Sequence, residues 1–284
     1  MFDSVLLTVD FDRTLTGPDS TIPERNLQAI RWFIANGGTF TMNTGRSVNT
    51  FKHYLDVIPV NAPFLLYNGS AEYENGALGN YRIIDLPMWE MIDVLAEAFP
   101  ELNLEVQGER VHYQINPKPE YLKFYQALGW DYEIVSHGQD LGPFLKLSLF
   151  GVVHEYTVGG MFVGTEEEIR RFDELEAFIH SRWGHKAEVF RAAPRIIDVH
   201  AKGVSKIRAA RDLQARLGKK ILVCVGDAEN DLTMLEGADY AFCPSDGVVA
   251  ARFPNVCPCG EGAVADVIYK KIPEILGISL DITE

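Results

Sequence analysis

Short apolar runs alternate with amphipathic segments in the first third of the chain. Ser4–Val9 is a mainly apolar run, typical of a strand buried on both faces. Pro23 opens a predicted helix, and strands are predicted at Thr39–Met42 and Phe64–Tyr67 with a helix at Ser47–Val57 between them. This alternation predicts a parallel sheet covered by helices.

The pattern changes in the middle third of the chain. Pro87–Phe99 predicts an amphipathic helix, but Leu102–Gln107 and Arg110–Ile115 alternate polar and apolar residues, which indicates a half-exposed antiparallel pair. The aromatic residues of this third recur at helical and strand spacing, which favours a hydrophobic core over a specificity pocket. They are Trp89, Tyr113, Tyr121, Phe124, Tyr125 and Trp130. The histidines, His112 among them, are scattered and receive no role.

From about Arg195 the first pattern returns. Strands are predicted at Ile196–Val199, Ile221–Val225 and Tyr240–Cys243, with helices between and after them. The predicted fold class is therefore α/β, a Rossmann-like parallel-sheet core with an inserted α+β module. We expect a discontinuous core over 1–85 and 191–284 and an inserted domain over 86–190.

Charge and hydropathy narrow the class of protein. Twenty-six basic and forty acidic side chains give a net charge of −14, which disfavours nucleic acid and anionic membrane as partners. No apolar run approaches the ~18–20 residues of a membrane span, and the N-terminus has no basic signal region. We therefore expect a cytoplasmic protein whose four cysteines are reduced thiols.

Two carboxylates follow the first predicted strand. Asp10 and Asp12 lie two residues apart in the string Asp10–Thr16. They suit a hard divalent cation or a nucleophile with an acid/base partner, since ligands of a parallel sheet gather at the carboxyl ends of its strands. The alternative is a turn in which the aspartates cap backbone groups. The full Asp-x-Asp-x-Thr string favours the functional interpretation.

The loop after Ile221–Val225 carries a second acidic cluster. Three acids, Asp227, Glu229 and Asp231, stand with Asn230 at a strand-to-helix junction, where simple capping needs one such residue. So much negative charge is unfavourable unless a cation compensates it. This loop therefore indicates metal binding.

Two further loops offer groups for a phosphoryl oxygen. Thr44 supplies a hydroxyl and Gly45 a close backbone approach at a helix start, although a helix N-cap explains the same residues. Lys202 and Lys206 each offer a point charge, and each is also compatible with a solvated helix start. Together the four loops hold the groups needed for magnesium-assisted phosphoryl transfer.

These loops, in this order, resemble the motifs of the haloacid dehalogenase superfamily. The layout is most similar to its Cof-like phosphatases, which carry a large α+β cap after the second motif. The matching stretches are Asp10–Thr16, Thr44-Gly45-Arg46, Gly203–Lys206 and Gly226–Asp231, with Asn68-Gly69 after the third strand. The resemblance identifies residues 86–190 as the cap and selects Lys206 over Lys202.

The resemblance also implies roles. Asp10 would be the nucleophile that forms an aspartyl-phosphate, and Asp12 the general acid and then the base. Mg²⁺ would be bound by Asp10, the backbone carbonyl of Asp12, and Asp227, with Asp231 as ligand or outer neighbour. The groups expected to hold the phosphoryl oxygens are Thr44, Gly45, Lys206, Asn230 and the backbone amide of Phe11.

The resulting hypothesis is a magnesium-dependent phosphatase of a small phosphorylated metabolite, with a sugar phosphate favoured as substrate. A phosphomutase of the same fold and a non-catalytic ligand sensor are the alternatives. The sensor is disfavoured because none of the acids and lysines is missing. Neither the individual substrate nor an oligomeric state is predicted.

Overall fold

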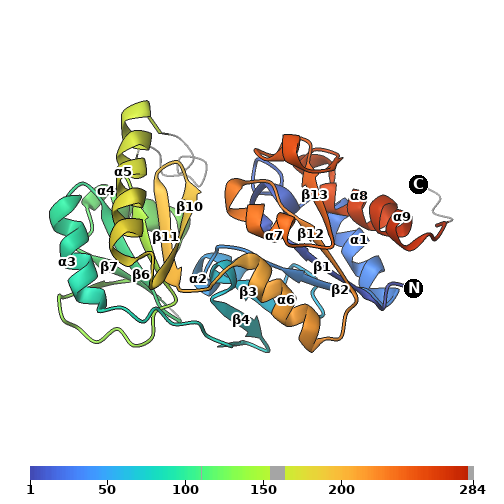
Figure 1. Cartoon of the computed structure of the whole chain (residues 1–284), viewed down its shortest axis with the longest axis horizontal. Coiled ribbons are helices and arrows are strands. Elements are labelled where there is room, and N and C mark those ends of the chain that lie inside the picture. Colours follow the sequence, from blue (N-terminus) through green and yellow to red (C-terminus); the bar gives the residue numbers. More distant parts are fainter. Residues whose placement is uncertain (110, 154–163, 281–284) are drawn as a thin grey trace. The chain divides into compact units, whose positions relative to one another are not determined.

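Residues 1–109, 111–153 and 164–280 are described by a computed structural model, in which contacts define two compact units (Figure 1). The core unit comprises 1–45, 53–77 and the chain from 205 onward, and the insertion unit comprises 46–52 and 78–204. The division into a core domain over 1–85 and 191–284 and an inserted domain over 86–190 stays a prediction.

The core unit is built on a five-stranded parallel sheet in the order β14-β13-β12-β1-β2. These strands are β1 (Val5–Val9), β2 (Thr39–Met42), β12 (Ile221–Val225), β13 (Tyr240–Pro244) and β14 (Asn255–Val256). Val9 pairs with both Met42 and Val225, so three strands end level with one another. The loops that follow these strands consequently leave the same edge of the sheet.

Helices cover this sheet and are drawn around it in Figure 1. They are α1 (Glu24–Ala35), α6 (Lys206–Arg216), α7 (Leu232–Glu236), α8 (Ala263–Asp266) and α9 (Ile272–Leu276). Ala210 and Leu213 of α6 pack against Leu6 of β1 and Leu222 of β12. A small second sheet, β3 (Phe64–Leu66), β4 (Ala71–Glu74) and β5 (Ala77–Gly79), meets β2 through a parallel bridge between Leu65 and Asn43.

The insertion unit contains a six-stranded sheet in the order β10-β11-β9-β6-β7-β8. Its strands are β6 (Asn103–Gln107), β7 (His112–Ile115), β8 (Tyr132–Val135), β9 (Lys146–Phe150), β10 (Ala187–Ala193) and β11 (Ile196–Ala201). Its helices are α3 (Met88–Ala98), α4 (Pro119–Leu128) and α5 (Glu166–Trp183). The expected antiparallel pair is present as β6 and β7, although Arg110, where the second strand was expected to begin, lies outside the described residues.

The two faces of the six-stranded sheet differ in polarity. Leu104 and Val106 of β6 share an apolar core with residues of α3 and α5. On the opposite face Glu105 of β6 meets Tyr121 and Tyr125 of α4, which are buried as expected of a core. One side of this sheet is therefore a hydrophobic layer and the other a buried polar layer.

The prediction that Ile196–Val199 begins the return to the core was wrong. These residues belong to β11, which pairs antiparallel with β9 and β10 in the insertion unit. Ile197 and Val199 face the apolar core, and Asp198 between them hydrogen-bonds to Ser148. The segment alternates like the other strands of this sheet, so an apolar run was too coarse a criterion.

The helix expected over Ser47–Val57 is shorter in the structure. It consists of α2 (Val48–Phe51) and a single 3₁₀ turn at Lys52–Tyr54. Residues Arg46–Lys52 belong by their contacts to the insertion unit, although the chain before and after them belongs to the core unit.

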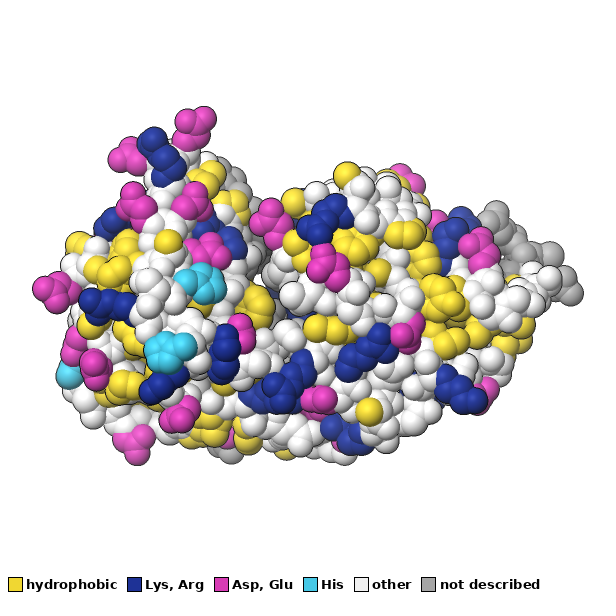
Figure 2. Space-filling view, in the orientation of Figure 1, with side chains coloured by type: hydrophobic (Ala, Val, Ile, Leu, Met, Phe, Trp, Pro, Cys, Tyr) yellow, Lys and Arg dark blue, Asp and Glu magenta, His cyan; other side chains and the backbone are white. Residues whose placement is uncertain are grey.

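The surface drawn in Figure 2 mixes acidic, basic and apolar side chains. Large exposed hydrophobic residues of the described chain include Val57, Ile83, Ile134 and Val248, which lie far apart in the sequence. Among the described residues, no helix has both the length and the apolarity to cross a membrane.

Candidate active site

The loop after β1 places two carboxylates and a threonine at the edge of the core sheet. The backbone amide of Asp10 donates to the carbonyl of Val225 on the next strand, at 2.9 Å. The chain then turns through Arg13, whose φ of 57° is left-handed. Thr14 is fully buried and donates its hydroxyl to Oδ1 of Asp227 at 3.0 Å. The loop of the first strand is thereby joined to the loop of β12.

The loop after β12 is organised around Asp231. Its Oδ2 accepts hydrogen bonds from the backbone amides of Asp227 (3.0 Å) and Ala228 (3.2 Å). A Cβ at Gly226 would lie 2.7 Å from Cβ and Cγ of Asp231, so glycine is required for this close approach. Oδ2 of Asp231 therefore stabilises its own loop, and Oδ1 binds a different partner.

That partner is Lys206, the first residue of α6. Its Nζ donates to Oδ1 of Asp10 at 2.5 Å and to Oδ1 of Asp231 at 2.6 Å. The backbone carbonyl of Lys206 accepts from Nδ2 of Asn43, which follows β2. Lys206 is 2% exposed, so both ion pairs are shielded from water.

Asp10, Asp227 and Asp231 are all buried, and one ligand oxygen from each lies within 4.8 Å of the other two. The ammonium group of Lys206 pairs with two of these carboxylates, Asp10 and Asp231, and its charge also acts on Asp227. Burial and the charge of Asp231 raise the pKa of Asp10 well above its ordinary range, although Lys206 opposes this. Burial and Asp231 also raise the pKa of Asp227 to about 7.

Burial is the first cause of both raised pKa values, and repulsion from the Asp231 carboxylate adds to it, so a further cation would stabilise the ionised cluster. Burial lowers the pKa of Lys206, but its two carboxylate partners outweigh burial and raise it, so the lysine stays protonated. Carboxylate oxygens are the ligands that Mg²⁺ prefers. The donor set, its spacing and its surplus charge therefore fit a hard divalent cation.

The loop after β2 carries the candidate phosphate seat, which we define as Thr44 and Gly45. Thr44 is 1% exposed; its backbone amide donates to the carbonyl of Leu65, and its carbonyl accepts from the amide of Asn68 at 2.9 Å. A Cβ at Gly45 would lie 2.8 Å from Oδ1 of Asn68. Glycine is needed here because the side chain of Asn68 occupies that space.

The other predicted site residues occupy the same loops. Asp12 is half-buried in the loop after β1, and the ring of Phe11 packs against Tyr54 with 4.5 Å between centroids. Asn230 lies in the 3₁₀ turn Glu229–Asp231. Lys202, the lysine not selected, contacts the carbonyl of Gly184 and Glu188 in the insertion unit.

Sequence reasoning missed two positioning residues. Thr14 holds Asp227, and Asn43 holds the backbone of Lys206. Thr14 stands inside the Asp-x-Asp-x-Thr string, so the string itself carried a signal for it. The partner of Asn43 is 163 residues away, and nothing in the local sequence marks that contact.

A comparison with protein families matches residues 7–249 to the haloacid dehalogenase-like hydrolases. Among curated proteins, the HMP-PP phosphatase of Escherichia coli O157:H7 is 23% identical over 269 residues, covering 92% of this chain and 93% of that protein. The 5-amino-6-(5-phospho-D-ribitylamino)uracil phosphatase of Bacillus subtilis strain 168 is 21% identical, over 87% of this chain and 88% of its own.

Solved structures share the fold. A structure described as a subclass IIB sugar phosphatase of the same superfamily aligns with a TM-score of 0.74 and 20% identity, covering 96% of this chain and 99% of that one. The similarity covers both units of the chain, so an α/β core interrupted by an α+β insertion occurs in both proteins.

Proposed function

Because the chain belongs to the haloacid dehalogenase-like hydrolases, as the match over residues 7–249 shows, we propose that it is a magnesium-dependent phosphatase of a small phosphorylated metabolite. The observation that carries the proposal is the buried set of Asp10, Asp227 and Asp231 around Lys206. Its surplus negative charge needs a cation, and its lysine stands beside the carboxylate assigned as nucleophile.

Relatives support the class of substrate. The curated relatives named above are phosphatases of HMP-PP and of a phosphoribitylamino-uracil, and one structural relative is described as a sugar phosphatase. Each of these three names describes a phosphatase of a small phosphorylated molecule. A sugar phosphate remains the favoured substrate for this chain.

In the proposed reaction a carboxylate oxygen of Asp10 attacks phosphorus, and the bond between phosphorus and the ester oxygen breaks. Asp12 gives its proton to the departing alcohol. A water molecule then attacks the aspartyl-phosphate, Asp12 takes a proton from it, and Asp10 is released with inorganic phosphate. Atoms and charge balance over the two displacements, and Asp12 ends as it began.

Lys206 has a double task in this scheme. Its ammonium group holds Oδ1 of Asp10, which orients the carboxylate, and its charge reduces repulsion between Asp10 and an anionic phosphoryl group. The phosphate seat, Asn230 and the amide of Phe11 are assigned to the phosphoryl oxygens. Asp10, Asp227, Asp231 and the carbonyl of Asp12 are assigned to Mg²⁺, which would neutralise charge as phosphorus is attacked.

The test is release of inorganic phosphate from an aryl phosphate and from a panel of phosphorylated metabolites. We expect release with Mg²⁺ and none with a chelator. Isomerisation of a sugar phosphate without net release of inorganic phosphate would indicate a phosphomutase instead of a phosphatase. Undiminished release in the chelator, or in Asp10→Asn, would contradict the assignment.

A further inference from the structure

Helix α2 follows the phosphate seat in sequence, yet its side chains bind the insertion unit. Nδ2 of Asn49 donates to the backbone carbonyl of Asp131 at 2.6 Å, and the amide of Asp131 donates back to Oδ1 of Asn49 at 3.1 Å. Nζ of Lys52 contacts the Asp131 carboxylate at 2.6 Å. Asn49 within α2 and Lys52 at its C-terminal end are thus both bonded to Asp131 of the insertion unit.

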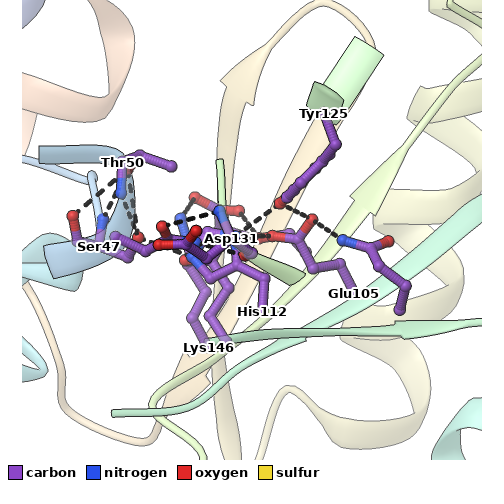
Figure 3. Close-up of polar contacts among 12 residues, drawn as sticks. Ser47, Thr50, Glu105, His112, Tyr125, Asp131 and Lys146 are labelled. Carbon is purple, nitrogen blue, oxygen red and sulfur yellow. Dashed lines mark hydrogen bonds and ion pairs between the residues drawn. The ribbon is translucent and has the colours of Figure 1, made fainter. Parts of the chain in front are cut away.

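Ser47 is the N-cap of α2 and stands two residues after Gly45. Its Oγ accepts from the amide of Thr50, and its own amide donates to Oγ1 of Thr50, each at 3.2 Å. The same Oγ lies 2.7 Å from Nε2 of His112 on β7. Figure 3 shows Ser47 and Thr50 on one side of His112, with Glu105 and Tyr125 on the other.

Behind His112 lies a fully buried carboxylate, that of Glu105. It accepts from the hydroxyls of Tyr121 (2.8 Å) and Tyr125, and from the amide nitrogens of Gln107 (2.5 Å) and Gln114 (2.9 Å). Nδ1 of His112 is 3.1 Å from its Oε1. Burial alone would raise the pKa of Glu105, but the charge and hydrogen bond of His112 and the bonds from Tyr125 and Gln114 lower it to about 2.

These contacts link four side chains in a fixed order. An ionised Glu105 is only an acceptor, so the single proton of the Tyr125 hydroxyl points at Glu105. The Tyr125 oxygen must then accept from Nδ1–H of His112 at 2.6 Å. Nε2, on the other side of the ring, lies within hydrogen-bond distance of Ser47 Oγ, so both ring nitrogens of His112 have partners. Ser47, His112, Tyr125 and Glu105 form one ordered chain, here called the Ser47–Glu105 chain.

Serine, histidine and carboxylate in this order also occur in nucleophilic triads. Ser47 and His112 are each 1% exposed and Glu105 is 0% exposed, and Ser47 Oγ is already the acceptor of an N-cap bond. A nucleophile must reach an external carbonyl or phosphorus atom, and this one is buried and occupied. The arrangement is suited to holding Ser47 in place.

We propose that the Ser47–Glu105 chain positions the phosphate seat, with Ser47 and His112 as positioning residues for phosphoryl binding. The inference rests on the proposed function, because the seat is defined by it. The seat precedes Ser47 by only one residue, Arg46, so a shift of Ser47 is passed to the Gly45 backbone through two peptide bonds. Displacement of a binding group by about 1 Å can lower activity ~10²-fold.

The hydrogen bonds to His112 restrict the orientation of its ring. A buried histidine with both ring nitrogens bonded has little freedom to reorient, since each alternative rotamer leaves a buried polar atom unpaired. The carboxylate behind it is held by four further donors from β6, β7 and α4. These donors hold His112, and through it Ser47, within the insertion unit, whereas the backbone of Thr44 is bonded to Leu65 and Asn68 within the core unit.

The test compares variants that cut the chain with variants that make the same chemical change elsewhere. Ser47→Ala and Tyr125→Phe each remove one hydroxyl of the Ser47–Glu105 chain, and His112→Phe removes the imidazole that joins them. Thr165→Ala is the control for Ser47→Ala, because Thr165 caps α5 of the same unit with the same capping box. Tyr81→Phe is the control for Tyr125→Phe, because Tyr81 likewise donates to a glutamate of the insertion unit, Glu109, and is not a member of the Ser47–Glu105 chain.

KM for an aryl phosphate, kcat, and the inhibition constant of inorganic phosphate are measured for each variant in the full chain with Mg²⁺. We expect the three chain variants to raise KM and the inhibition constant by about 2- to 30-fold, with kcat changed less. The two controls should leave both constants within 2-fold. A purely structural loss would lower the fraction of folded protein, and hence apparent kcat, without moving KM.

Three outcomes separate the possible failures. An active wild-type protein whose chain variants bind phosphate unchanged contradicts the positioning role alone. A wild-type protein that neither releases phosphate nor binds it contradicts the proposed function, and the positioning role with it. Additive effects of Ser47→Ala and His112→Phe on phosphate affinity would also overturn the proposal, because members of one chain must show coupling.

Discussion

The core unit and the insertion unit each bury carboxylates, and the pKa values of these carboxylates shift in opposite directions. In the core, Asp10, Asp227 and Asp231 lie together, Lys206 pairs with two of them, and the pKa values of Asp10 and Asp227 are raised. In the insertion, Glu105 is surrounded by hydrogen-bond donors and its pKa is lowered to about 2. Burial is similar at the two sites, so the difference lies in the supply of donors and positive charge.

This contrast separates a site prepared for a ligand from a structural network. A carboxylate that is fully hydrogen-bonded within the protein stabilises the fold and has little to offer a cation. Carboxylates that repel one another cost stability until a cation joins them. The direction of the pKa shift, read together with the partners, therefore distinguishes the two roles.

The largest expected effect belongs to the core cluster and concerns activity. Asp10→Asn should lower phosphate release from an aryl phosphate by about 10⁴-fold or more, because the amide is a poor nucleophile. Asp12→Asn should lower turnover by about 10²–10⁴-fold, the usual contribution of general acid–base catalysis. Asp19→Asn, an exposed aspartate further along the same stretch, is the matched control and should keep wild-type turnover.

The next effect belongs to the insertion and concerns stability. Glu105→Gln should lower the free energy of unfolding by about 3 kcal/mol, because an amide leaves His112 and several donors without their charged acceptor. Urea unfolding of the purified chain measures it. Glu133→Gln, an exposed position on β8, should change stability by less than about 0.5 kcal/mol. Equal effects at Glu105 and Glu133 would remove the contrast between the two sites.

A smaller effect of opposite sign is expected in the core. Asp227→Asn removes one of three mutually repelling carboxylates while Thr14 keeps an acceptor in the amide oxygen. We expect the metal-free protein to gain about 1 kcal/mol of stability and to lose stabilisation by Mg²⁺. Thermal unfolding with and without Mg²⁺ measures both. A destabilised variant that still responds fully to Mg²⁺ would show that Asp227 is a structural residue.

The smallest effect is a dependence on acid pH. Because the folded-state pKa of Glu105 is lowered, its stabilising contribution is fully present above the unfolded value of 4.5 and is lost as pH falls toward about 2. The difference in unfolding free energy between wild type and Glu105→Gln should therefore shrink by less than about 1 kcal/mol at pH 4. A difference that is constant between pH 7 and pH 3 would contradict the lowered pKa.

The parallel core could be predicted because its strands are short apolar runs followed by chemically distinctive loops. Asp10, Asp227 and Lys206 follow from loop position and motif order, and the structure brings their side chains together with Asp231. The insertion was harder, because its strands alternate and its polar face is buried. Thus Ile196–Val199 was assigned to the wrong sheet.

His112 shows why the rest escaped prediction. In the sequence it is an isolated histidine, and its partners Ser47 and Tyr125 lie 65 and 13 residues away. A hydrogen-bond chain of this kind is assembled by the pairing of β6 with β7 and by the packing of α4, none of which leaves a local pattern around His112. Only tertiary structure brings its members together.

We propose that the three carboxylates Asp10, Asp227 and Asp231 of the core unit share one divalent cation. Anomalous diffraction from crystals of the full chain grown with Mn²⁺ locates that cation. We predict one strong anomalous peak at about 2.0–2.3 Å from carboxylate oxygens of Asp10 and Asp227, lost in Asp227→Asn crystals. A peak elsewhere, with Lys206 alone still bridging Asp10 and Asp231 at saturating Mn²⁺, would contradict it.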